Sequence, residues 1–428
     1  MNRNAVALAT DSAVTTRNSQ GVKVHNSANK LFTLSKYYPV GIMIYSSADF
    51  MGYPWETLIK VFRGWLRKQS FPTVDEYAQS FFDFLLSQAS VFTSERQTDW
   101  FRVQAVRILN VLNDRLAEVV RAHIDQHGVI DDETVQTLFE QALTELEGVL
   151  LSKEILPLYA EATDRNQFET AASEILDQVI ADVFQALPIQ LYLDRLKTLV
   201  SHRLMSDTAL DFTGLVFAGF GENEMLPVVS SFWCDGVFAG RIRYGTYPKL
   251  SANLNESPNA WIIPFAQSDT VFRFLQGIDP VYKREAQGHV QSLVSEVVQH
   301  VNTTNAHRYT GPEDKAQAEE ALQGLTAFET SKLNERLNVL ESQRFVAPVL
   351  DVIDSLPKDD LAAIAESFVN LTSFQRKILR EVETVGGPID AAVISKGDGF
   401  VWIKRKHYFD KDLNPAFFAN YYQGDDND

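Results

Sequence analysis

Cysteine is almost absent from this chain of 428 residues, and long apolar runs are missing. Because Cys234 is the only cysteine, the chain cannot form an internal disulfide or a cysteine-based metal cluster. No run reaches the roughly 18 apolar residues that a membrane-spanning helix needs, and the first residues lack the basic-then-apolar order of a secretion signal. We therefore expect a cytoplasmic protein with no membrane partner.

Basic residues are also fewer than acidic ones. The chain has 39 lysines and arginines against 56 aspartates and glutamates, a formal net charge of −17. Such a chain repels phosphate backbones, so nucleic acid is not expected as a partner. Gly219 and Gly221 are not followed by the Lys-Ser/Thr of a phosphate-binding loop, and no cofactor is expected. With 45% hydrophobic residues, the chain can still form a sizeable core.

Strand signals dominate the first 50 residues. Ala5–Ala9 is a short apolar run that ends in a loop containing Asp11. Val40–Tyr45 is a continuous apolar run, typical of a strand buried on both faces. Two shorter strand-like pieces, Val22–Val24 and Lys30–Leu34, lie between them. The segment predicts a sheet that leads into a helix at Trp55.

Several polar groups follow these strands. The carboxylate of Asp11, the amine of Lys30 and the backbone N–H groups of the turn at Ser46 and Ser47 could converge at one end of one sheet. A carboxylate, an amine and free N–H groups are the parts of a site that activates a nucleophile. Taken alone, the pair has a plainer interpretation, in which Asp11 caps a loop and Lys30 is a solvated strand lysine.

This order of elements resembles the proteasome-type members of the N-terminal nucleophile hydrolase superfamily. In that family an Asp after a strand and a downstream Lys activate an amino-terminal Thr, and a small-residue turn supplies the oxyanion N–H. The resemblance implies that Asp11 and Lys30 are the activating pair and that Ser46 and Ser47 form the oxyanion turn, although the expected glycine is absent. It also implies that Ser268 helps to move the proton; alternatively, Ser268 caps the following helix.

The strand that carries the nucleophile in this family is not represented. Ahead of Ala5 stand only Met1–Asn4, enough for a hairpin turn but not for a strand of about 5–6 residues. Two expectations stay open. Either a Thr, Ser or Cys lies upstream of Met1, or the chain is a relative that cannot perform the reaction.

Helical periodicity prevails from Trp55 to Met205. Thr73 and Glu76 predict a capping box, Asp131 and Asp132 predict a helix start and Gly128 predicts a helix end. His123 and His127 have a spacing that could chelate a metal. At the end of a helix their positive charge equally suits the helix dipole, so no metal site is predicted.

The second half alternates strands and helices. Two or three antiparallel strands are expected after Asp211, with turns at residues 221–223 and 234–236, followed by a strand at Trp261–Phe265. Long charged helices are expected over residues 282–344. A last helix and a hairpin, residues 389–394 with 400–403, resemble the end of a proteasome-type subunit. Glu381 and Thr384 are candidates for bracing the nucleophile, and the basic residues 404–407 are expected as an exposed strand end.

The predicted fold is α+β. By the resemblance it is a four-layer αββα sandwich, with two antiparallel sheets face to face and helices outside. Its core comprises residues 1–68, 208–281 and 356–428, with helical insertions at 69–207 and 282–355. The implied function is cleavage of peptide or amide bonds; the alternative is a catalytically inactive, partner-binding scaffold subunit. Self-association is expected, as is a possible protein partner for the helical insertions.

Overall fold

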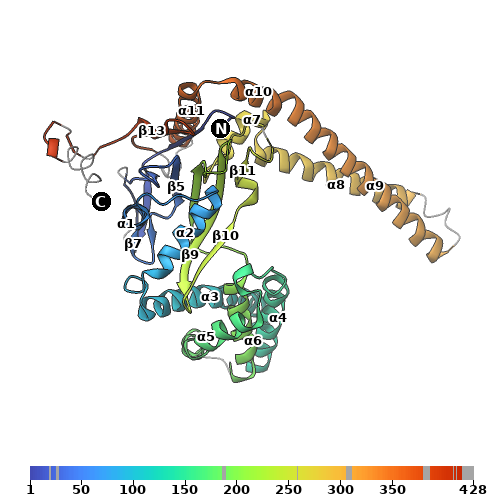
Figure 1. Cartoon of the computed structure of the whole chain (residues 1–428). Helices are drawn as coiled ribbons and strands as arrows, with labels where there is room; N and C mark the ends of the chain where they lie inside the picture. The colour runs from blue at the N-terminus through green and yellow to red at the C-terminus, as the bar shows by residue number, and fades with distance from the viewer. Residues whose placement is uncertain are drawn as a thin grey trace. The chain divides into compact units, whose positions relative to one another are not determined.

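The computed structural model describes residues 1–18, 21–25, 28–185, 189–257, 259–304, 311–378, 386–407, 409–410 and 412–416 (Figure 1). The fold is α+β, as predicted. The chain divides into two units. The first unit comprises residues 1–31, 218–228 and 252–428, and the second comprises residues 32–217 and 229–251.

The first unit contains a three-stranded antiparallel sheet in the order β1-β12-β13. Its strands are Val6–Thr10 (β1), Asp390–Ser395 (β12) and Gly399–Lys404 (β13). Every residue of β12 is buried, whereas β13 is exposed or half-buried, as expected of a central strand and an edge strand. Helix α11 (Lys358–Ile378) packs against β1 and β12. The predicted C-terminal helix and hairpin are thereby confirmed.

The first residues form a tight turn, as expected because the four residues ahead of Ala5 are too few for a strand. Asn2 and Ala5 form an isolated antiparallel bridge around Arg3 and Asn4. The wholly buried Asn2 side chain donates to the backbone oxygens of Ile353 and Leu356, each at 2.9 Å. The turn is therefore fixed to the end of helix α10 (Ala347–Ser355).

Two predictions for this unit were wrong. Val14–Asn18 (β2) forms a hairpin with Gly21–His25 (β3), where a loop had been expected after Asp11. Residues 261–265 are not a strand. Trp261 exchanges two hydrogen bonds with Met1: its N–H donates to the Met1 oxygen at 3.0 Å, and its own oxygen accepts from the Met1 amino group at 2.7 Å. The pairing does not extend into a ladder over residues 262–265. A short apolar run is a strand only where a neighbouring strand supplies partners for its backbone.

The remaining helices of the first unit follow one another. They are α7 (Asp269–Gln276), α8 (Pro280–Thr304) and α9 (Pro312–Glu341). A π-helical turn, Ser342–Val346, joins α9 to α10. Helices α8 and α9 run antiparallel, side by side, and we call this pair the arm (Figure 1).

The larger sheet has the strand order β10-β9-β8-β5-β4, and β11 (Ala252–Asn253) pairs with β9. Its strands are Leu31–Thr33 (β4), Val40–Ser46 (β5), Thr213–Gly219 (β8), Val228–Phe238 (β9) and Arg241–Thr246 (β10). Two short strands, Asp49–Phe50 (β6) and Tyr53–Pro54 (β7), follow β5. The expectation that the strands of Asp11 and Ser46 share a sheet was wrong, because β1 belongs to the three-stranded sheet.

The turn predicted at residues 234–236 does not exist. Strand β9 continues through them, and the chain reverses at Ala239 and Gly240, which have φ angles of 51° and 72°. Asp235 stays in the strand because Arg243 of β10 lies 3.2 Å from its carboxylate, and both side chains are 1% exposed. Asp favours a turn when its side chain hydrogen-bonds its own local backbone, whereas the Asp235 carboxylate contacts Arg243 and accepts the N–H of Leu210.

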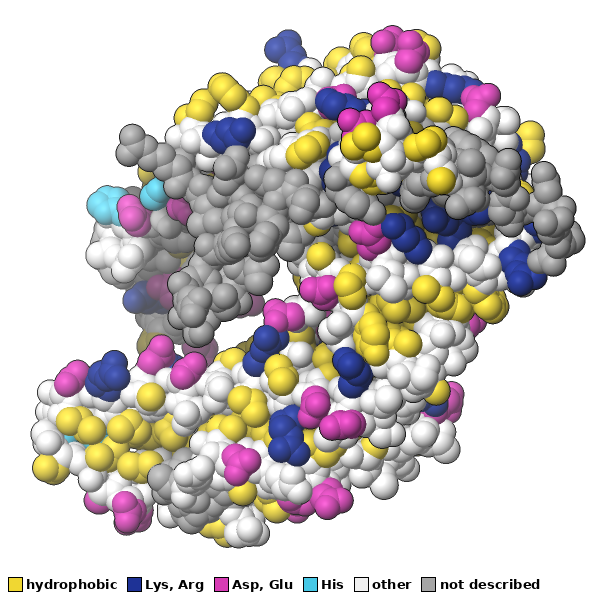
Figure 2. Space-filling view, turned by 90° about the vertical axis from the view of Figure 1, so that its left-hand side faces the viewer, with side chains coloured by type: hydrophobic (Ala, Val, Ile, Leu, Met, Phe, Trp, Pro, Cys, Tyr) yellow, Lys and Arg dark blue, Asp and Glu magenta, His cyan; other side chains and the backbone are white. Residues whose placement is uncertain are grey.

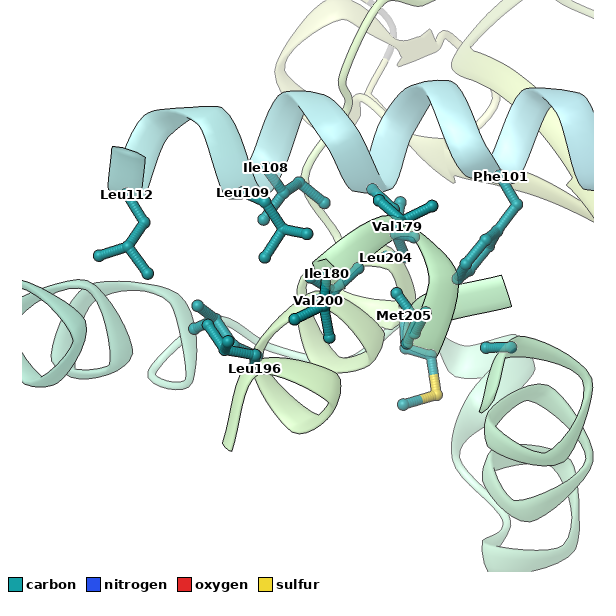
Figure 3. Packing of buried hydrophobic residues seen from close by; sticks show 14 of the residues in the cluster. Phe101, Ile108, Leu109, Leu112, Val179, Ile180, Leu196, Val200, Leu204 and Met205 are labelled. Carbon is teal, nitrogen blue, oxygen red and sulfur yellow. The ribbon is translucent and has the colours of Figure 1, made fainter. Parts of the chain in front are cut away.

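The helices of the second unit are α1 (Trp55–Leu66), α2 (Val74–Ser87), α3 (Ser94–His127), α4 (Asp132–Leu150), α5 (Ala162–Val183) and α6 (Leu193–Met205). The predicted caps at Thr73, Asp131 and Gly128 are confirmed. Helices α3 to α6 form one hydrophobic core, in which Phe101, Leu109, Ile180 and Leu204 point toward one another (Figure 3). We call these four helices the bundle.

Candidate functional site

Asp11 and Lys30 are in contact in the first unit. Asp11 follows the last residue of β1, and Lys30 Nζ donates to its Oδ1 at 2.8 Å. The two side chains are only 11% and 14% exposed. The interpretation of Lys30 as a solvated strand lysine is therefore wrong.

The second carboxylate oxygen of Asp11 is held by the backbone. Oδ2 accepts the N–H of Ala13 at 3.1 Å and that of Gly386 at 3.0 Å. A nearly buried ion pair is stable only if further hydrogen bonds replace lost water, and these two amides do so. Asp11 thus caps its own loop, as the plainer interpretation held, and also fixes a cationic amine near the surface.

A second Asp–Lys pair adjoins the first, at Asp390 and Lys406. Lys406 Nζ donates to Asp390 Oδ2 at 2.8 Å, to Ser12 Oγ at 2.5 Å and to the Ala28 oxygen at 2.7 Å. Ser12 is wholly buried and donates to the Pro388 oxygen at 2.5 Å. All three protons of this ammonium are used, so the group is a clamp between chain segments far apart in sequence.

The second pair was not predicted, and the expected environment of Lys406 was wrong. Residues 404–407 were expected as an exposed strand end, but the Lys406 side chain is only 11% exposed. Its neighbours Lys404 and Arg405 are exposed, as expected. The sequence does contain a signal for this pair, because Asp390 begins an apolar strand and a carboxylate buried in such a strand requires a cationic partner. In the structure the Asp390 side chain is 3% exposed.

Ser46 and Ser47 lie at the end of β5, in the second unit. Ser46 has a φ of 73°, in the left-handed region that glycine adopts most readily. Ser47 Oγ accepts the N–H of Asp49 at 3.2 Å, and its backbone oxygen accepts the Thr213 hydroxyl at 3.3 Å. The turn therefore has a glycine-like backbone although glycine is absent.

Ser268 occupies the residue before helix α7, in the first unit. Its backbone oxygen accepts the N–H of Phe272 at 2.9 Å, but its hydroxyl makes no capping hydrogen bond. The side-chain cap that was the alternative for Ser268 is therefore not formed. Glu381 and Thr384 lie outside the described residues.

The side chains that could carry metal or thiol chemistry are dispersed. Within the described ranges no group of three or more His, Cys, Asp and Glu side chains is placed to hold a metal ion. The ring of the half-buried His123 stacks on that of the exposed His127, the last residue of α3, with the ring centroids 4.3 Å apart. Cys234 is buried, and burial raises the pKa of its thiol well above the ordinary value.

Two properties of the surface bear on partners. Lys and Arg side chains are interspersed with Asp and Glu on the face that Figure 2 shows. None of the helices in the described part of the chain is both long enough and apolar enough to span a membrane.

Comparisons of the chain with protein-family models, with curated proteins and with solved structures found no match.

Proposed function

We propose that the chain is a proteasome-like N-terminal nucleophile hydrolase that cleaves peptide or amide bonds. The observation that carries this proposal is the contact between Asp11 and Lys30, which the resemblance had identified as the activating pair. In this proposal the fold is a four-layer αββα sandwich, and the nucleophile is a Thr, Ser or Cys that precedes Met1 in the protein as it is produced.

Each residue would have a separate task in the reaction. The α-amine of the nucleophilic residue takes the proton of its own side chain, and the Lys30 charge, held by Asp11, favours the resulting anion. Ser268 passes the proton to the leaving amine.

The test uses protein produced from its own gene, with its natural start. It is incubated with a peptide epoxyketone, which reacts with an amine and a nucleophile on the same residue, and intact mass is measured. We expect one adduct per chain, lost in Lys30→Met and kept in Lys404→Met, whose exposed lysine contacts Glu366 instead. A folded protein that forms no adduct contradicts the proposal.

A second candidate function is a non-catalytic, partner-binding subunit. The Lys406 network favours it, because Ser12 is wholly buried and the Lys406 protons are all bound within the chain, as in a purely structural clamp. An unprocessed chain that forms oligomers and no adduct is the expected result for this candidate.

A further inference from the structure

Asp11 and Lys30 lie on separate chain segments of the first unit. Asp11 directly follows β1, whereas Lys30 lies immediately before β4, 19 positions farther along the chain. Their contact therefore requires the segment around Asp11 and the segment around Lys30 to be held together. A backbone hydrogen bond does this at one point, where the N–H of Ala28 donates to the Ser12 oxygen at 3.2 Å. Such a bond contributes little net stability, because both groups bind water in the unfolded chain.

Lys406 joins the same two residues a second time. Its ammonium donates to the Ser12 hydroxyl at 2.5 Å and to the Ala28 oxygen at 2.7 Å. Ser12 adjoins Asp11 in the chain, and Ala28 lies two positions before Lys30. Hydrogen bonds from a charged donor are stronger than those between neutral groups. Two points of attachment fix the orientation of the two segments as well as their separation.

The Lys406 ammonium is itself held at the end of the three-stranded sheet. Its third hydrogen bond goes to Asp390 Oδ2 at 2.8 Å, and the backbone N–H of Lys406 donates to Asp390 Oδ1 at 2.8 Å. Asp390 begins β12 and lies opposite Thr10, the last residue of β1. The sheet therefore fixes Lys406 beside the point where the chain leaves β1 for Asp11.

We propose that Lys406 is a positioning residue, which holds the segments of Asp11 and Lys30 in the arrangement that brings the Lys30 amine to the Asp11 carboxylate. The importance of this role for catalysis rests on the proposed function, in which the Lys30 charge favours the anion of the nucleophile. The effect of Lys406 on the position of Lys30 is independent of any reaction.

The test measures how fast the Lys30 amine reacts with acetic anhydride in the full chain. This reagent reacts with accessible, neutral amines, whereas the Lys30 side chain is 14% exposed and bound to Asp11. Peptide mapping by mass spectrometry gives the rate at each lysine. We expect Lys406→Met to raise the rate at Lys30 at least about tenfold, because two hydrogen bonds of a charged group no longer join the segments. An unchanged rate at Lys30 overturns the proposal.

Two controls separate positioning from a general loss of stability. Lys404→Met removes the exposed lysine at the end of β13 and is expected to leave Lys30 at the parent rate. Lys197 is the internal reference, since it is 22% exposed and lies 2.7 Å from Asp177 in the second unit. Its rate is expected to stay constant in both variants. If the rates at Lys30 and Lys197 rise together in Lys406→Met, that lysine maintains the whole fold and the proposal is overturned.

Ser12→Ala is the second variant, because Lys406→Met also leaves the buried Asp390 carboxylate without its cation. Ser12→Ala keeps the contact between Lys406 and Asp390 and removes one attachment of the segments. It is expected to raise the rate at Lys30 by about threefold, the effect of one hydrogen bond. A folded Ser12→Ala protein in which Lys30 reacts at the parent rate contradicts the proposal.

The epoxyketone reaction distinguishes a failure of this proposal from a failure of the proposed function. If the parent chain forms the adduct, Lys406→Met is expected to slow adduct formation at saturating reagent by about tenfold, because a misplaced amine weakens the chemical step. The reagent concentration that gives half of the maximal rate is expected to stay the same. An unchanged adduct rate beside a raised rate of Lys30 acetylation overturns the catalytic importance of Lys406. If the parent chain forms no adduct, the proposed function is contradicted, and the acetylation rates still decide whether Lys406 positions Lys30.

Discussion

The bundle and the arm are both built from long, charged helices, but they bury very different amounts of apolar surface. In the bundle, each of the four helices places apolar residues in one core, and Phe101, Leu109, Leu143 and Leu199 are all fully buried. In the described part of α8 and α9, Val298 is the buried hydrophobic residue. Two helices cannot enclose a core, so most apolar side chains of the arm remain exposed.

The largest expected effect is the removal of an aromatic ring from the bundle. The Phe101 ring stacks on that of Phe238, with ring centroids 4.2 Å apart, and lies edge-on to that of Phe168, with ring centroids 5.9 Å apart. Phe101→Ala leaves a cavity and is expected to lower the free energy of unfolding by about 3–5 kcal/mol. Urea denaturation of the full chain measures this change.

The matched control is Leu293→Ala on the arm. Because this leucine is 62% exposed, its truncation is expected to change the free energy of unfolding by no more than about 0.5 kcal/mol. Similar losses for the two variants would contradict the contrast between bundle and arm.

Features that depend on neighbouring residues could be predicted from the sequence, whereas features that depend on residues elsewhere in the chain could not. Caps at Thr73, Asp131 and Gly128 are local, since their side chain or φ angle acts within one turn, and these were predicted correctly. The contact between Asp11 and Lys30 was expected from a resemblance in chain order. Burial on one face of a helix is harder to infer from spacing: Trp65 of α1 lies one turn after the buried Phe62 yet is 46% exposed.

Predictions were wrong where a contact with a residue elsewhere in the chain determined the local structure. Asp235 remains in a strand because its carboxylate contacts Arg243. The Lys406 side chain points inward because its ammonium donates hydrogen bonds to Asp390 and Ser12. Composition and spacing contain no information on these contacts, which join residues from 8 to 394 positions apart. A charged residue in an apolar strand indicates that a partner exists, but not which residue it is.

The next effect concerns Gly277, which ends helix α7 just before the arm begins. Gly277 has a φ of 69°, and an added Cβ would lie 2.6 Å from the Phe345 ring. Gly277→Ala is therefore expected to destabilise the chain by about 1–2 kcal/mol, from the left-handed backbone alone. Gly288 lies within α8 with no atom within 4 Å of an added Cβ, so Gly288→Ala is expected to stabilise by about 0.5–1 kcal/mol. An unfolding temperature that rises in Gly277→Ala as it does in Gly288→Ala would show that the backbone at Gly277 is not tightly packed.

The smallest effect is a pH dependence in the bundle. His202 lies 3.1 Å from the Leu151 oxygen, and burial lowers the pKa of its imidazole below the ordinary 6.5. Between the lowered value and 6.5 the unfolded chain binds the proton more readily than the folded chain, so the free energy of unfolding rises with pH in this window. In His202→Gln the amide can still donate to Leu151, and this part of the pH slope is expected to disappear. His289→Gln on the exposed arm is expected to keep it, because that side chain is not buried in the fold. If urea denaturation between pH 5 and about 7 gives the same slope for both variants, then burial of His202 does not distinguish the bundle from the arm.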